Sequence, residues 1–164
     1  MMADMQDSVT RASEAAVALR RELHRRPELS WREVETTEKI AARMAELGVS
    51  VIKRGFKGTQ CGLVAEIKGA KSGPTLMIRA DIDALPVNED PSHDVRSECD
   101  GVMHACGHDA HAAILAGVVQ VVQEHRDELC GAVRFLFQPA EEAGPGSGAP
   151  AVIADGALEG VDAI

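Results

Sequence analysis

Alternation between helix-like and strand-like apolar patterns is the feature of this sequence that most restricts its fold. Apolar residues recur at helical spacing over residues 8–26, 31–47 and 110–125, and a short helix is expected near 149–154. Strand-like runs cover residues 61–69, 74–83 and 131–139, with shorter ones expected at 49–53 and from residue 161. The turn-rich stretch 69–74 predicts a hairpin between the strands on either side of it. We therefore expect one α/β domain, a mixed sheet flanked by helices.

Composition and charge argue against several classes of protein. Hydrophobic residues make up 45% of the chain but aromatic residues only 2%, which predicts an aliphatic core. A formal net charge of -9 without a basic stripe argues against a nucleic-acid partner. The longest apolar run, residues 112–119, is far shorter than the ~20 residues that cross a bilayer, and the N-terminus lacks the apolar stretch of a signal peptide. Four cysteines without a Cys-x-x-Cys pair predict reduced thiols and a cytoplasmic protein.

Chemistry-bearing residues concentrate in the stretch GVMHACGHDAHAAILAG, residues 101–117. Cys106 and His108 flank a glycine, so a thiolate and an imidazole can face one space, and both are good ligands for zinc and related metals. The N-terminus of the helix that follows would favour a thiolate at Cys106 and a carboxylate at Asp109. The alternative interpretation is a buried thiol beside a His-Asp pair that caps the helix.

Two further segments carry acids where a strand is expected to end. Glu141 and Glu142 follow the strand at 131–139, and Asp81 and Asp83 lie at the end of the strand at 74–83. Open α/β sheets build their sites at the carboxyl ends of strands, so these acids are expected to meet near Cys106 and His108. Solvated acids in turns are the plainer alternative. The stretch GPGSG, residues 144–148, lacks the ending of a phosphate-binding loop and is expected to form a hinge or a pocket wall.

The same segments carry a family resemblance that extends over nearly the whole chain. The stretches LHRRPELSWREVETTEKIAARMAELG, IRADIDALPV, GVMHACGHDAHAAILAG, FLFQPAEEAGPGSG and DGALEGVDAI occur in the order typical of one family. The chain resembles the N-terminal part of metal-dependent amidohydrolases, which include hippurate hydrolases, aminoacylase-like N-acyl-amino-acid amidohydrolases and indole-acetyl-amino-acid hydrolases. This resemblance implies a zinc-peptidase-like catalytic domain.

The resemblance also implies a two-metal site and assigns its residues. Carried over by position, Cys106, His108 and Glu142 are metal ligands and Glu141 is the general base. The implied reaction is hydrolysis of an amide bond in N-acyl amino acids, dipeptide-like or similar small amides. Two divalent ions (Zn, Mn, Co or Ni) and the Glu141 base activate the attacking water.

The chain departs from the family in length. We expect residues 1–164 to be an N-terminal segment of the catalytic domain, without the lid and dimerisation domain and without the C-terminal catalytic segment. The resemblance implies homo-oligomers for full-length members. It also implies histidine ligands beyond Ile164, and none of the unassigned histidines matches them: His93, His104, His111 and His125.

Two alternatives from other classes stay open. The chain could be a catalytically inactive fragment that binds only metal or a partner. A thiol hydrolase with Cys106 as nucleophile and a histidine as base is the other alternative, but it leaves Glu141 and Glu142 without a role.

Overall fold

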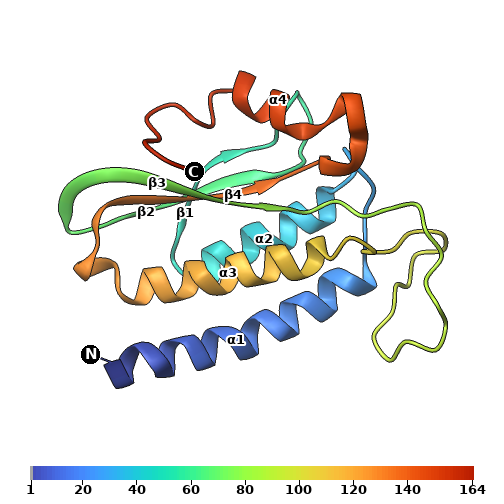
Figure 1. The fold of residues 1–164 in the computed structure, drawn as a ribbon, viewed down its shortest axis with the longest axis horizontal. Helices are drawn as coiled ribbons and strands as arrows, with labels where there is room; N and C mark the ends of the chain where they lie inside the picture. Colours follow the sequence, from blue (N-terminus) through green and yellow to red (C-terminus); the bar gives the residue numbers. More distant parts are fainter. Residues whose placement is uncertain (1) are drawn as a thin grey trace.

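The computed structural model describes residues 2–164 and shows helices on both faces of a four-stranded sheet (Figure 1). The α-helices are α1 (Met2–Arg25), α2 (Val34–Glu46), α3 (His108–Glu124) and α4 (Gly148–Ala154), and short 3-10 helices span Arg126–Glu128 (η1) and Glu141–Gly146 (η2). The strands are β1 (Ser50–Arg54), β2 (Leu63–Lys68), β3 (Lys71–Asp81) and β4 (Cys130–Gln138). Among these residues no helix is both long and apolar enough to cross a membrane.

The sheet is mixed, as expected, but its strand order differs from the prediction. The order is β1-β2-β4-β3, with β1–β2 and β2–β4 antiparallel and β3–β4 parallel. The predicted hairpin between β2 and β3 is therefore wrong, because β4 lies between them. The last four residues of β4 are all buried, so this strand suits a central position with a partner on each side. Gly131, with a φ of +87°, lets β4 enter there, since a Cβ would lie 1.9 Å from the Pro74 carbonyl oxygen.

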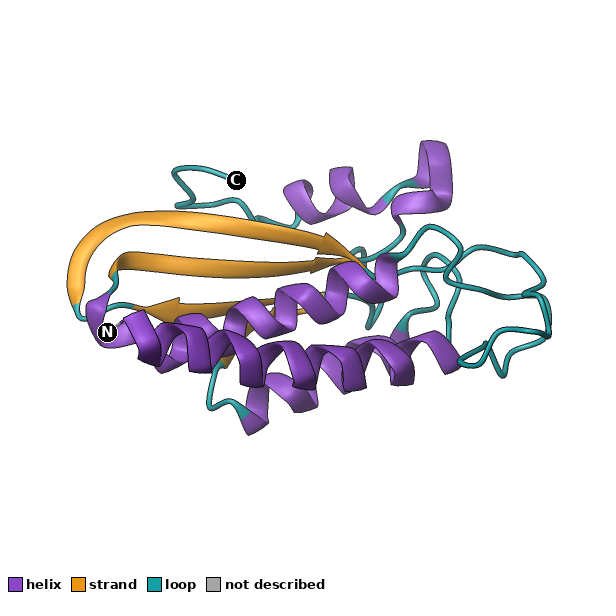
Figure 2. Ribbon diagram, turned by 60° about the horizontal axis from the view of Figure 1, so that its bottom comes forward, coloured by secondary structure: helices purple, strands orange, loops and turns teal. Residues whose placement is uncertain are grey.

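Two apolar clusters fill the space between the sheet and its helices. Helices α2 and α3 cover one face, α1 packs on the outer side of α3, and α4 covers the opposite face (Figures 1 and 2). The larger cluster lies under α2 and α3, and the smaller one lies under α4. The core is not purely aliphatic, because Phe56, Phe135 and Phe137 are fully buried. The few aromatic residues of the chain thus contribute strongly to both clusters.

The parallel pair β3–β4 brings the chemistry-bearing segments to one edge of the sheet. Asp81 pairs in register with Gln138, so the segments that follow both strands leave the sheet side by side. Helix α3 begins at the same edge with His108. The strand expected from residue 161 is present as a single parallel bridge, in which the Met77 N–H donates to the Ala163 carbonyl at 2.8 Å.

Candidate metal centre

The structure brings the three residues assigned as ligands, Cys106, His108 and Glu142, to one place. One ligand atom of each lies within 4.8 Å of the other two. His108 is buried, Glu142 is half-buried and Cys106 is exposed, so the cluster opens to solvent on the thiol side. Such a thiol, imidazole and carboxylate set matches the donors that zinc-like metals use.

The orientation of His108 is set by Asp83. His108 Nδ1 lies 2.9 Å from the Asp83 main-chain oxygen and 3.1 Å from its Oδ1, and both partners are acceptors. Nδ1 therefore carries a hydrogen, and Nε2 is the ring nitrogen that faces the site and could bind a metal. A metal-binding histidine is held in this way, with its second nitrogen donating to a carboxylate or a carbonyl.

Three carboxylates surround His108 Nε2 without a hydrogen bond to it. The nearest oxygens of Asp81, Glu142 and Glu141 lie 3.6, 3.7 and 3.9 Å away. These distances are too long for hydrogen bonds but short enough for one ion to contact several groups. The described residues thus fit a divalent cation, because a concentration of negative charge around one imidazole nitrogen is stabilised by a positive ion.

Asp83 links two of the ligand-bearing segments. Its fully buried carboxylate accepts hydrogen bonds from the Ser30 hydroxyl at 2.7 Å and from the Glu142 N–H at 2.9 Å, in addition to His108. Burial by itself raises the pKa of Asp83, but the hydrogen bonds from His108 and Ser30 outweigh burial and lower it. Asp83 therefore stays ionised and fixes the relative position of His108 and Glu142.

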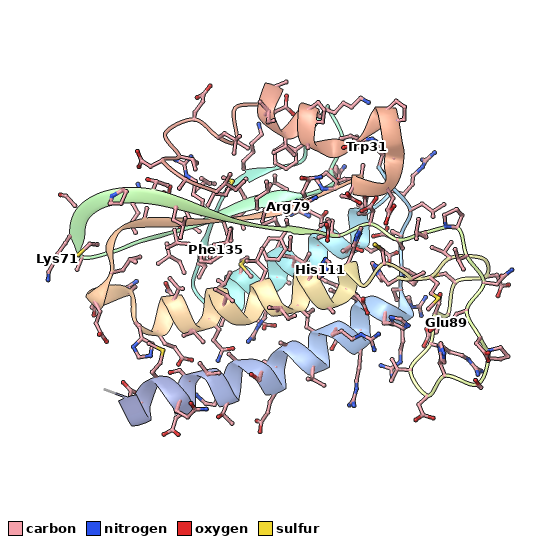
Figure 3. The ribbon with its side chains drawn as sticks, viewed as in Figure 1. Trp31, Lys71, Arg79, Glu89, His111 and Phe135 are labelled. Carbon is pink, nitrogen blue, oxygen red and sulfur yellow. The ribbon has the colours of Figure 1, made fainter. Side chains whose placement is uncertain are left out.

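A second group of candidate ligands shares His108. One atom each of Asp81, His108 and His111 also lies within 4.8 Å of the others. His111 Nδ1 is 2.7 Å from Asp81 Oδ1, its ring stacks on that of His108 at 5.6 Å, and Arg79 holds the other Asp81 oxygen at 3.1 Å (labels Arg79 and His111 in Figure 3). Sequence reasoning gave His111 no role. The i, i+3 spacing of two histidines on one helix would have revealed this group.

The electrostatics of the site act against a free thiolate. The contact with Glu142, together with burial and the charges of Asp81 and Glu141, raises the pKa of Cys106. Burial lowers the pKa of His108, but the hydrogen bond to Asp83 and the charge of Asp81 have the larger effect and raise it. Without a cation Cys106 is thus a protonated thiol, which argues against the thiol-hydrolase alternative.

Glu141 and Glu142 begin the 3-10 helix η2 directly after a strained residue. Ala140 has a φ of +53°, and its N–H donates to the buried Glu33 carboxylate at 2.7 Å. The Glu141 side chain is 41% exposed and that of Glu142 24%, so Glu141 has the greater freedom. The glycine-rich stretch after them is attached to the segment before α2, since Trp31 Nε1 donates to the Gly146 carbonyl at 2.8 Å.

The fold and the candidate metal centre are both of the metallopeptidase type, and the fold matches such catalytic domains over part of their length. A sequence profile described as peptidase family M20/M25/M40 matches residues 77–164, and the chain belongs to this family. This result confirms the predicted family and fold class.

Three relatives illustrate the similarity. The chain is 47% identical over 148 residues to an N-acetylcysteine deacetylase of Bacillus subtilis, covering 90% of this chain and 38% of the relative. It is 40% identical to an N-acyl-L-amino acid amidohydrolase of Geobacillus stearothermophilus, covering 90% of this chain and 39% of the relative. Among solved structures, a dinuclear metal binding M20 peptidase of B. subtilis superposes with a TM-score of 0.84 at 44% identity, covering 95% of this chain and 41% of that one. The chain thus spans about 40% of the length of these relatives.

Proposed function

We propose that this chain is the N-terminal segment of the catalytic domain of an amidohydrolase that hydrolyses N-acyl amino acids or similar small amides. The orientation of His108 carries the proposal. Its Nδ1 donates to Asp83 and its Nε2 faces three carboxylates, an arrangement suited to metal binding. The names of the relatives, a deacetylase and an amidohydrolase of N-acylated amino acids, support the reaction and the substrate class.

Cys106, His108 and Glu142 would hold the metal, and two divalent ions are proposed because one similar structure is described as dinuclear. When bound, such ions supply Lewis acidity to a carbonyl oxygen and to water. The donor set accommodates Zn, Mn, Co or Ni. Asp81 and His111 lie beside this set and offer further donor atoms.

Glu141 would move the proton. Asp83 fixes the main chain of Glu142 through its N–H, whereas Glu141 is more exposed and free to reach a water molecule. As general base, the Glu141 carboxylate takes a proton from the attacking water and returns it to the leaving nitrogen. Loss of a general base typically lowers the rate by about 10²–10⁴-fold.

Two matched substitutions test the separation of roles. We expect Glu141→Gln to retain metal and Glu142→Gln to lose it, measured by equilibrium dialysis of the 164-residue chain with Zn or Mn. In a full-length relative, the change matching Glu141→Gln should abolish hydrolysis of an N-acyl amino acid at unchanged metal content. Equal metal loss in both variants would show that the roles are not separated.

The alternative of metal binding without turnover has one observation in its favour. The proposed ligand set contains three side chains, which leave each ion of a two-metal site short of protein donors. We therefore expect the 164-residue chain to bind metal weakly and to hydrolyse no hippurate. Hydrolysis in proportion to the metal content would refute this expectation and show that Asp81, His111 or another described residue completes the site.

A further inference from the structure

The histidine at the end of α1, His24, bridges two buried carboxylates behind the candidate metal centre. It is 3% exposed, its Nδ1 lies 2.8 Å from Asp109 Oδ2, and its Nε2 lies 2.8 Å from Glu89 Oε1. We propose that His24 is a positioning residue that fixes the segment carrying Cys106. This inference rests on the proposed function, because it takes Cys106 to be a metal ligand.

The bridge is part of a cluster of basic and acidic side chains. Both partners of the His24 ring are carboxylate oxygens, and each ring nitrogen lies 2.8 Å from one of them. Arg20 Nε donates to the same Asp109 oxygen at 2.7 Å, and one of its terminal nitrogens lies 3.1 Å from His24 Nδ1. Burial by itself raises the pKa of Glu89, but hydrogen bonds from His24 and His93 lower it to about 2. The His24 ring and the Arg20 guanidinium thus face the carboxyl groups of Asp109 and Glu89, and buried acids are tolerated when they are paired and hydrogen-bonded in this way.

The two carboxylates lie on opposite sides of Cys106 in the chain, Glu89 before it and Asp109 after it. Glu89 lies in the loop between β3 and α3, beside the end of α1 (Figure 3), and its second oxygen accepts the Ser97 N–H. The base of this loop is closed by Leu85 and Met103, which exchange two main-chain hydrogen bonds of 3.0 Å. Asp109 lies in the first turn of α3, next to His108. His24 therefore ties the loop before Cys106 to the helix after it.

Cys106 depends on its flanks for its position. Its side chain is exposed, and Gly107, which follows it, has a φ of +83° with open space around the position of a Cβ. His108, in contrast, is fixed independently through Asp83. Loss of His24 should therefore disturb the Cys106 thiolate more than the His108 imidazole, which separates this role from a general effect on folding.

Co²⁺ is the probe for the test, since a cobalt–thiolate bond gives a charge-transfer band and Cys106 is the cysteine of the candidate ligand set. Because Cys61, Cys99 and Cys130 are also free thiols, loss of the band in Cys106→Ser assigns it to Cys106. We expect His24→Gln and Glu89→Gln in the 164-residue chain each to weaken Co²⁺ binding about 10–100-fold, the typical effect of losing an outer hydrogen-bond partner. The band should also be weaker per bound ion. The double variant should bind Co²⁺ no less tightly than the single variant with the lower affinity, because both changes break the same bridge. His125→Gln serves as the control, since His125 contacts α1 through Ser8 at 3.3 Å, at the N-terminal end of that helix.

Two results would overturn the proposal. One is a His24→Gln variant with the affinity and band of the unsubstituted chain; the other is a double variant whose losses multiply. Should His24→Gln fail to fold, Glu89→Gln alone decides by the same readouts. If the unsubstituted chain gives no thiolate band, Cys106 as a ligand fails, and amide exchange then tests the bridge by itself. His24→Gln should speed exchange at Ser97 and Met103 relative to His125→Gln, and unchanged exchange would refute the bridge.

Discussion

Replacing Asp83 by asparagine would change one hydrogen-bonding atom at the centre of the site. The asparagine side chain is nearly the same size, and its amide oxygen could keep the hydrogen bonds from Ser30 and Glu142. Its NH₂ group would then face His108 Nδ1, where the carboxylate now accepts at 3.1 Å. Two donors would oppose each other unless the imidazole hydrogen moved to Nε2, the atom that faces the three carboxylates.

Either outcome of Asp83→Asn weakens metal binding. A hydrogen bond to a charged group contributes about 1.5–3 kcal/mol, which corresponds to about 10–160-fold in metal affinity. The same loss should lower the melting temperature of the metal-free chain by about 2–4 °C per kcal/mol at this chain length. Metal titration, nitrogen NMR of the His108 ring and thermal unfolding measure the three effects.

Asp155→Asn is the matched control for Asp83→Asn. Asp155 is exposed and accepts the Lys57 N–H at 2.8 Å, so its substitution should leave metal binding unchanged. The reasoning fails if Asp83→Asn binds metal as tightly as the unsubstituted chain while His108 Nε2 stays without a hydrogen. In that case the main-chain oxygen of Asp83, 2.9 Å from Nδ1, would be sufficient to orient the ring.

Three further substitutions test other parts of the structure. Burial raises the pKa of Glu33, so its contribution to stability is present at low pH and lost as the pH rises through the folded pKa. Glu33→Gln should therefore flatten the fall in the free energy of unfolding with pH, and parallel curves in denaturant titrations would contradict this. Gly148→Ala places a Cβ 1.8 Å from the Pro139 carbonyl oxygen and should cost about 1–3 kcal/mol by overpacking, whereas Gly146→Ala meets its first atom at 4.0 Å and should be near neutral. Phe135→Ala, in the larger core cluster, should lower the free energy of unfolding by about 3–5 kcal/mol in the same titrations, and a loss below about 1 kcal/mol would contradict its packing.

Local patterns in the sequence predicted the elements well but not their neighbours. The apolar segments at 31–47 and 131–139 correspond to Val34–Glu46 and Cys130–Gln138, because spacing and turn residues act over a few positions. The prediction of a hairpin at 69–74 was wrong because strand pairing depends on distant residues. Turn residues indicate where a chain changes direction, whereas strand pairing depends on which distant strand is apolar enough to lie between two others, and here this is β4.

The candidate site likewise contains residues that local motifs predict and contacts that they do not predict. Cys106, His108 and the Glu141-Glu142 pair are short motifs, so sequence reasoning could select them, and the structure places them within reach of one another. Their roles remain predictions. The contribution of Asp83 was not predictable, because its partners lie 25 to 59 residues away and include a main-chain N–H that no side-chain pattern reveals.

The segment between α1 and α2, together with the end of α1, contacts residues next to several of the candidate ligands, although sequence reasoning identified no functional residue in it. His24 reaches the loop and the first turn of α3, Ser30 reaches Asp83, and Glu33 accepts the N–H of Ala140 immediately before the two glutamates. None of these contacts requires a ligand atom, so no metal-binding motif marks them. Each fixes a backbone or a second carboxylate, and a site in which acids crowd one imidazole depends on such contacts to keep those acids from moving apart. We therefore expect substitutions in this segment to have a larger effect on metal affinity than on the melting temperature of the metal-free chain.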